Sequence, residues 1–160
     1  MALGDNTLRS AAGNSQRGRN PYMVQTTLNW ATALSDKGSA LAASDVVPVI
    51  AVPKGTMVLN AGIEVETASD GSTFTVDLGM VDADVFVDGF DATSAAAVVA
   101  QNPAAYQPVM AVADDNIDVT IATLSGGAVS SGKFRVWAVL MDCTDMGDTS
   151  ANEVDRDTLA

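Results

Sequence analysis

Short runs of apolar residues separated by turn-forming residues make up most of the chain. The clearest run is residues 73–78, in which Phe74, Val76 and Leu78 alternate with polar residues. This two-residue period is typical of a strand with one buried face. Comparable runs occur at residues 22–30, 46–52, 57–59, 63–65, 80–90, 106–113, 117–122 and 133–141. The pattern predicts about seven to nine short strands and hence an all-β domain.

Turn and helix signals lie between these runs. Asp70-Gly71 is a strong signal for a two-residue hairpin, because Gly adopts positive φ at little cost. Residues 91–103 favour a short helix, since Asp91 can cap its start, alanines fill its middle and Pro103 stops it. We therefore expect one helix, which covers a sheet edge or links two sheets.

These elements predict an all-β fold, a β-sandwich or jelly-roll-like domain with one short helix, over residues 22–142. Residues 1–21 show no hydrophobic period and predict an extended N-terminal arm. Residues 143–160 are polar and acidic and predict a C-terminal tail. The run at 133–141 is apolar on nearly both faces, so it is expected at the centre of the domain between covering layers.

Charge is distributed unevenly around a formal net value of −12. The first 44 residues carry four basic and two acidic side chains, whereas the following 116 carry four basic and 18 acidic ones. An acidic body argues against nucleic-acid binding, which requires clustered Lys and Arg against phosphates. The sequence has no run of 18 apolar residues and no signal-peptide core, so it is expected to be made in a cytoplasm and not to enter a membrane.

Residues suited to catalysis are sparse. The sequence contains no His, which removes the usual general base and the Ser-His and Cys-His nucleophile pairs. Cys143 is the single cysteine, so neither an intrachain disulfide nor a thiolate-rich metal site can form. A carboxylate pair could serve a glycosidase, but the aromatic residues needed for a sugar-binding groove are few. We therefore expect neither an enzyme nor a cofactor.

Aspartates crowd one segment of the chain and form the candidate metal site. Asp82, Asp84 and Asp88 offer the hard oxygen ligands that calcium prefers, and they would share one face of a strand over residues 80–90. Their spacing departs from an EF-hand loop, whose next ligand position falls on Phe86. The alternative is a solvated acidic strand face that discourages edge pairing. This alternative is favoured, and no metal is assigned.

Two stretches resemble a known family of proteins: PVIAVPKGTMVLNAGIEVETASDGSTFTVDLG at residues 48–79 and VFVDGFD at residues 85–91. They are similar to structural proteins of tailed-bacteriophage virions, above all capsid decoration (cement) proteins. The resemblance extends over residues 22–141 and rests on turns and strands rather than on a catalytic motif. It implies a β-rich domain, often trimeric, that binds the outside of the major capsid protein lattice and staples neighbouring subunits.

The same resemblance implies that a terminal arm carries contacts to the capsid. The candidates for these contacts are Arg9, Arg17, Arg19 and Tyr22. The chain is accordingly expected on the exterior of a virion, as a homotrimer bound to the major capsid protein. A tail or head-fibre component, and a non-catalytic calcium- or sugar-binding β-module, are the alternatives left open.

Overall fold

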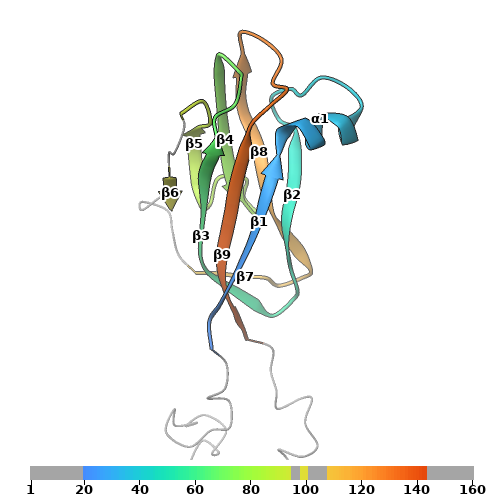
Figure 1. Cartoon of the computed structure of the whole chain (residues 1–160). Helices are drawn as coiled ribbons and strands as arrows, with labels where there is room; N and C mark the ends of the chain where they lie inside the picture. Colours follow the sequence, from blue (N-terminus) through green and yellow to red (C-terminus); the bar gives the residue numbers. More distant parts are fainter. Residues whose placement is uncertain (1–19, 95–97, 101–107, 144–160) are drawn as a thin grey trace, which may run out of the picture.

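The computed structural model describes residues 20–94, 98–100 and 108–143, which form a sandwich of two antiparallel sheets with one short helix (Figure 1). The elements are β1 (Tyr22–Asn29), α1 (Trp30–Lys37), β2 (Val46–Val52), β3 (Thr56–Thr67), β4 (Thr73–Gly79), β5 (Val87–Asp91), β6 (Val98–Ala100), β7 (Val109–Met110), β8 (Asp115–Ser125) and β9 (Lys133–Asp142). The all-β sandwich predicted from the sequence is confirmed. Apart from residues 20–21 and 143, the predicted arm and tail lie outside the described residues.

The strands pair in a nested order. One sheet, here called sheet A, has the order β1-β9-β3-β6, with β7 also pairing β3; the other, sheet B, has the order β2-β8-β4-β5. With β7 set aside, β1 pairs with β9, β2 with β8, β3 with β6 and β4 with β5, all antiparallel. Most connections therefore cross from one sheet to the other. The first and last strands lie side by side in sheet A (Figure 1).

The core lies between the two sheets and is filled by alternate residues of each strand. On β9 these are Phe134, Val136, Ala138 and Leu140, all buried. Trp30 closes one end of the core, with its ring centroid 5.0 Å from that of Phe74 and 5.4 Å from that of Phe134 in edge-to-face contacts. Such pairs stabilise a core beyond the area that they bury. Among the described residues, no helix has the length and hydrophobicity to span a bilayer.

The single helix does not lie where the sequence pattern predicted it. Residues 98–100 form β6, which pairs with β3, so the predicted helix over 91–103 is wrong there; residues 95–97 and 101–103 lie outside the described part of the chain. The observed helix, α1, follows β1 directly. The side chain of Asn29 accepts a hydrogen bond from the Ala31 N–H, and Gly38 ends the helix with a φ of +68°. These two caps outweigh a weak local helix signal.

The predicted Asp70-Gly71 hairpin is also wrong, because β3 and β4 belong to different sheets. The segment between them crosses the end of the sandwich instead. Gly71 is not among the glycines with positive φ. It is required by packing, since a Cβ there would lie 2.8 Å from Cγ2 of Val129. In the same way residues 57–59 and 63–65 are not two strands but parts of β3, which continues through a register shift between Val58 and Asn60.

Candidate assembly surface

The outward side of sheet A is apolar, although a sheet face without a covering layer normally alternates to polar residues. Strand register sets its side chains in rows: Met110, Met57 and Met141 form one row, and Asn60, Val139 and Met23 form the next. Gly62, Trp137 and Gln25 form the third row. We call the apolar members of these rows the apolar face: Met23, Met57, Met110, Trp137, Val139 and Met141.

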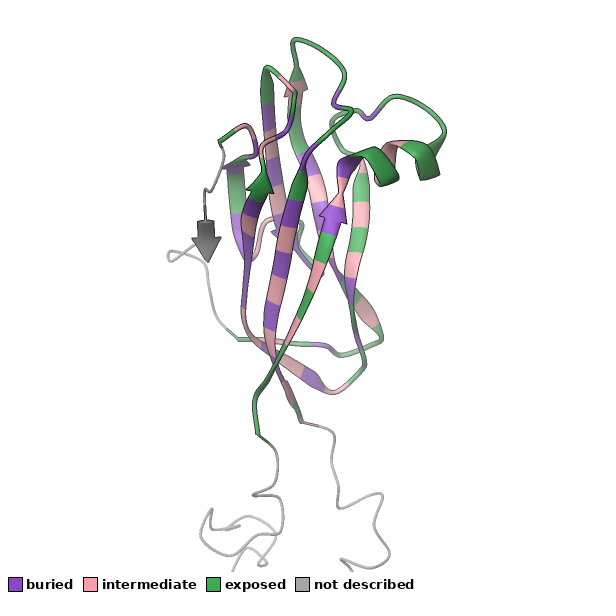
Figure 2. Cartoon of the chain, viewed as in Figure 1, coloured by how far each residue is buried: buried purple, intermediate pink, exposed green. Residues whose placement is uncertain are grey.

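Strand β9 shows why this face forms. Its residues alternate between the buried core and the apolar face, so buried and half-buried positions follow one another along the strand (Figure 2). The prediction that this strand lies centrally is confirmed within the sheet, where β1 and β3 flank it. None of the described helices and strands lies over its outward side (Figure 1). Met23 on β1 and Met110 on β7, which pairs with β3, are 62% and 38% exposed. The apolar face is therefore open to a partner.

A compensated polar row borders the apolar face. Nη1 of Arg135 lies 3.0 Å from Oε2 of Glu64, and its Nη2 lies 2.5 Å from Oε1 of Glu66. Solvent-exposed pairs of this kind contribute about 0.2–1 kcal/mol each, so their importance here is not stability. These ion pairs hold Arg135 of β9 against two glutamates of β3. The border therefore keeps a formal charge of −1, in a protein with a formal charge of −12.

The outward side of sheet B has the opposite chemistry on three of its four strands. Strands β4, β5 and β8 present threonines and aspartates, paired across the register as Thr75 with Asp91 and Asp77 with Thr120. The edge strand β2 presents Val46 and Pro48 instead, opposite Thr120 and Asp118. We call the polar part of this surface the acidic face: Thr75, Asp77, Asp88, Asp91, Asp118 and Thr120. Burial raises the pKa of Asp77, and the nearby Asp88 and Asp84 raise it further, against the lowering effect of a hydrogen bond from the Gly89 N–H. A surface of this kind favours water over an apolar partner.

The calcium candidates do not form the strand face that was predicted for them. Asp82 and Asp84 lie in turns between β4 and β5, and only Asp88 lies on a strand. The Met80 N–H donates to the Asp82 carbonyl, which folds this segment into a turn rather than a strand. Within residues 20–94, 98–100 and 108–143, no group of three His, Cys, Asp or Glu residues is placed to hold a metal ion.

Of the four residues predicted to contact a capsid, the structure describes only Tyr22. Arg9, Arg17 and Arg19 lie outside the described residues. Tyr22 is 45% exposed and starts β1, opposite Leu140 of β9. The described chain therefore begins and ends at the same end of the sandwich (Figure 1). The row of three methionines on the apolar face lies at this same end.

Sequence reasoning missed most of the apolar face. The run at 133–141 was recognised as apolar on both sides, but Met23, Met57 and Met110 were not singled out. These methionines lie in β1, β3 and β7, and the residues beside each of them in the sequence do not indicate that it belongs to an exposed apolar surface. They come together only through strand register, which connects residues as distant as 57 and 110.

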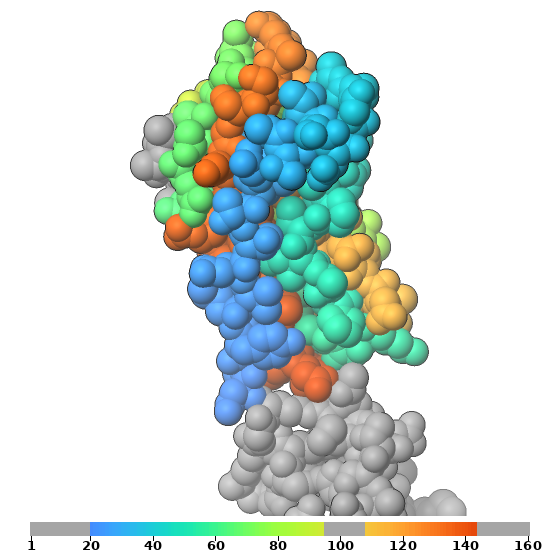
Figure 3. Space-filling view, turned by 45° about the vertical axis from the view of Figure 1, so that its right-hand side comes forward, coloured from blue at the N-terminus to red at the C-terminus, as the bar shows by residue number. Residues whose placement is uncertain are grey.

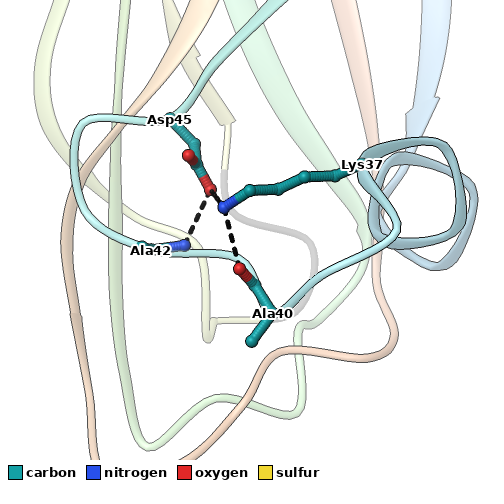
Figure 4. A network of polar contacts seen from close by, with 4 residues as sticks. All are labelled: Lys37, Ala40, Ala42 and Asp45. Carbon is teal, nitrogen blue, oxygen red and sulfur yellow. Dashed lines mark hydrogen bonds and ion pairs between the residues drawn. The ribbon is translucent and has the colours of Figure 1, made fainter.

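A depression of about 420 Å³ lies between α1 and β2, at the upper right of the space-filling view (Figure 3). Two charged side chains of its lining, Lys37 and Asp45, are already engaged with one another (Figure 4). Nζ of Lys37 lies 2.5 Å from Oδ2 of Asp45 and donates to the Ala40 carbonyl at 2.8 Å, while the Ala42 N–H donates to the same carboxylate. The bond from Lys37 is the main cause that lowers the pKa of Asp45. This network closes the loop before β2 and leaves little for a ligand.

Comparison with known proteins shows a similar fold in solved structures but no related sequence. No protein-family model and no curated protein sequence matches the chain. Three solved structures of phage capsids contain a similar chain. In the capsid of Ralstonia phage GP4 the TM-score is 0.58 at 14% identity, over 79% of this chain and 86% of that one. In the cyanophage Pam1 capsid asymmetric unit it is 0.60 at 16% identity, over 88% and 97%.

The third likeness is to a chain of the acidic stable capsid structure of Helicobacter pylori bacteriophage KHP30. Its TM-score is 0.50 at 14% identity, over 76% of this chain and 86% of that one. In all three cases the alignment spans most of both chains, so the likeness is to whole chains and not to a fragment. The protein shares its fold with chains found in phage capsids.

Proposed function

We propose that this chain is a structural protein of a phage head, a decoration (cement) protein that binds the outer surface of the capsid. The observation that carries the proposal is the fold likeness to chains of three phage capsids over most of both chains. The resemblance of residues 48–79 and 85–91 to decoration proteins agrees with it. The major capsid protein is the proposed partner, and a homotrimer on the virion exterior is the proposed state.

Strand topology supports the same proposal. We infer that the nested pairing of four strand pairs, from β1 with β9 to β4 with β5, is that of a jelly roll, a fold that recurs in viral capsid proteins. The short β7 is then an addition to the edge of β3. This connectivity joins the two chain ends to adjacent strands, so that both terminal segments can reach the same partner.

The proposed action is mechanical. Many modest contacts for each copy, repeated over a shell, oppose expansion of the head through avidity rather than through one tight site. The N-terminal arm, with Arg9, Arg17 and Arg19, adds cations to a protein whose body is strongly acidic, and these cations pair well with carboxylates on a shell. The domain supplies the rigid body that this arm anchors.

Electron microscopy of the assembled head tests the proposal directly. Heads assembled without this chain are incubated with the purified full-length protein and imaged beside untreated heads. We expect additional density on the outer surface, into which the sandwich fits with its chain ends toward the shell. Density confined to the tail or to the interior, or heads that bind none of the protein, would refute the proposed role.

Deletion of residues 1–20 tests the arm. We expect the shortened protein to lose binding to the heads while it retains the β-sheet circular dichroism and thermal transition of the full chain. Deletion of residues 144–160 is the matched control, because it removes a segment of similar length from the same end of the domain. Undiminished binding by the protein without its arm would exclude the arm as the anchor.

A further inference from the structure

We infer that the apolar face of sheet A is the contact between copies of this chain. The orientation used below rests on the proposed function, whereas the composition of the face does not. Six apolar side chains form it: Met23, Met57, Met110, Trp137, Val139 and Met141. Trp and Met are enriched in protein interfaces, and the flexible thioether lets Met adapt to an opposing surface. The occupant is a second copy of the same chain.

Charge selects this face over the rest of the protein for contact between copies. Every copy carries a formal charge of −12, so two copies repel unless they meet where acids are absent or neutralised. The acidic face of sheet B presents Asp77, Asp88, Asp91 and Asp118, which would lie opposite the same acids of a neighbour. On sheet A, Arg135 offsets one of the two negative charges of Glu64 and Glu66, and the apolar face beside them carries no charged side chain. Sheet A therefore offers the lower electrostatic cost.

The positions of the chain ends also favour the apolar face as the contact between copies. The first and last described residues, 20 and 143, both lie at one end of the sandwich, and the strands run along its length to the other end (Figure 1). If this end anchors the protein to a shell, the strands stand upright on it and both sheet faces point sideways. On a shell with a symmetry axis, the proteins beside each copy are sister copies. The apolar face then meets a sister copy, and the acidic face remains in water.

The size of the face predicts a weak contact. Three strands about 4.8 Å apart, followed for the five residues from Trp137 to Met141 at about 3.4 Å each, give a footprint of roughly 250 Å², to which the two residues of β7 add little. A standard stable interface takes about 800 Å² from each partner. The isolated protein should therefore associate only at high concentration. On a shell, anchoring by the arm raises the local concentration and completes the association.

The experiment is sedimentation velocity of the full-length protein over roughly 1 μM to 1 mM, the range in which a contact of this size is expected to form. We expect a concentration-dependent increase in mass. Val139→Asp places a carboxylate at the centre of the face and should weaken association about 10-fold or more, because that charge would be buried unpaired. Thr75→Asp, the matched control on the acidic face, should change association little.

Tryptophan fluorescence gives a second measurement at the face itself. Trp30 is fully buried in the monomer, so association should shift only the emission of Trp137, toward shorter wavelength. Trp137→Phe should abolish that shift. A wild type that stays monomeric at every concentration, or a folded Val139→Asp protein that associates as the wild type does, would overturn the inference. Either result would leave the proposed function standing if the protein still binds heads, so the two failures are distinguishable.

Discussion

The two outer faces of the sandwich differ sharply, although both consist of the outward half of strands whose inward half fills one core. Over its apolar face sheet A turns methionines, a valine and a tryptophan outward, and strands β4, β5 and β8 of sheet B turn threonines and aspartates outward. The inward residues of both sheets are alike, mainly Val, Ile, Leu and Phe. The fold is thus specified by the inward residues. The outward residues are what distinguishes the two faces.

The largest expected effect is a difference in folding stability between substitutions on the two sides of β9. Phe134→Ala should lower the free energy of unfolding by about 3–5 kcal/mol, because this fully buried ring is lost from between Trp30 and Phe74. Trp137→Ala should cost less than about 1.5 kcal/mol in the monomer, since the side chain has the sheet on one side only. Urea unfolding at low protein concentration measures both. Equal losses would mean that the apolar face belongs to the monomer core.

Salt should strengthen association between copies through the apolar face. Addition of about 0.5 M salt shortens the Debye length to roughly 4 Å and screens the repulsion between copies. Association through the apolar face should therefore strengthen several-fold, as measured by sedimentation equilibrium. Contacts made by ion pairs would weaken under the same conditions, so a decrease in association with salt would place the contact elsewhere. Val139→Asp protein serves as the control for non-specific salting-out.

Asp70 lies outside the acidic face, and its negative charge should stabilise the fold. The carboxylate of Asp70 accepts hydrogen bonds from the Ser130 N–H, the Ser131 N–H and the Ser130 hydroxyl, and so connects two loops at one end of the sandwich. The hydroxyl bond is the largest of the causes that hold its pKa well below the usual 3.8. The stabilisation from Asp70 is therefore complete above pH 3.8 and is lost as the pH falls below it.

Asp70→Asn should accordingly lower the melting temperature measurably at pH 7, and the difference from the wild type should narrow as the pH is lowered below that value. Differential scanning calorimetry across pH measures this. Asp36→Asn, an exposed change on α1, is the control and should shift the melting temperature much less at every pH. A difference that is constant with pH would mean that the charge of Asp70 is not what connects the loops.

Strands were predicted where alternation is local. β2, β4, β8 and β9 each contain a run whose period decides their faces without reference to other strands. β6 was missed because its three residues are a strand only through pairing with β3, more than 30 residues away. The alanines there favour helix, and tertiary pairing overrides that propensity.

The candidate surface was predictable only in part. The run at 133–141 predicted that β9 lies centrally between covering layers. The central place in sheet A is correct, but none of the described elements covers the outward side of the strand (Figure 1). A sequence pattern does not say whether a covering layer belongs to the same chain or to another chain. Met57 and Met110 join the surface only through the register of β3 with β7. Local periodicity carries no information about which strands pair, so the extent of the face required the structure.

The smallest expected effect is at Asp118 on the acidic face. Burial raises the pKa of this carboxyl above 3.8, Asp115 adds to the shift, and among the described residues its Oδ1 has no hydrogen-bond partner. Because the folded pKa is raised, the ionised form is disfavoured in the native protein, and stability increases as the pH falls through the raised pKa. Asp118→Asn should therefore stabilise the protein slightly at pH 7, by less than about 1 kcal/mol, and by less still near pH 3.8.

That pH dependence is opposite in sign to the one expected for Asp70, and the two variants are best compared in one titration of melting temperature. The acidic face then emerges as a surface kept charged at a small cost to stability, which is understandable if its charges keep copies from meeting there. A destabilised Asp118→Asn protein with normal self-association would contradict this account. An Asp118→Asn protein that is both more stable and more prone to associate through sheet B would support it, because neutralising one acid would weaken the repulsion that directs contact to sheet A.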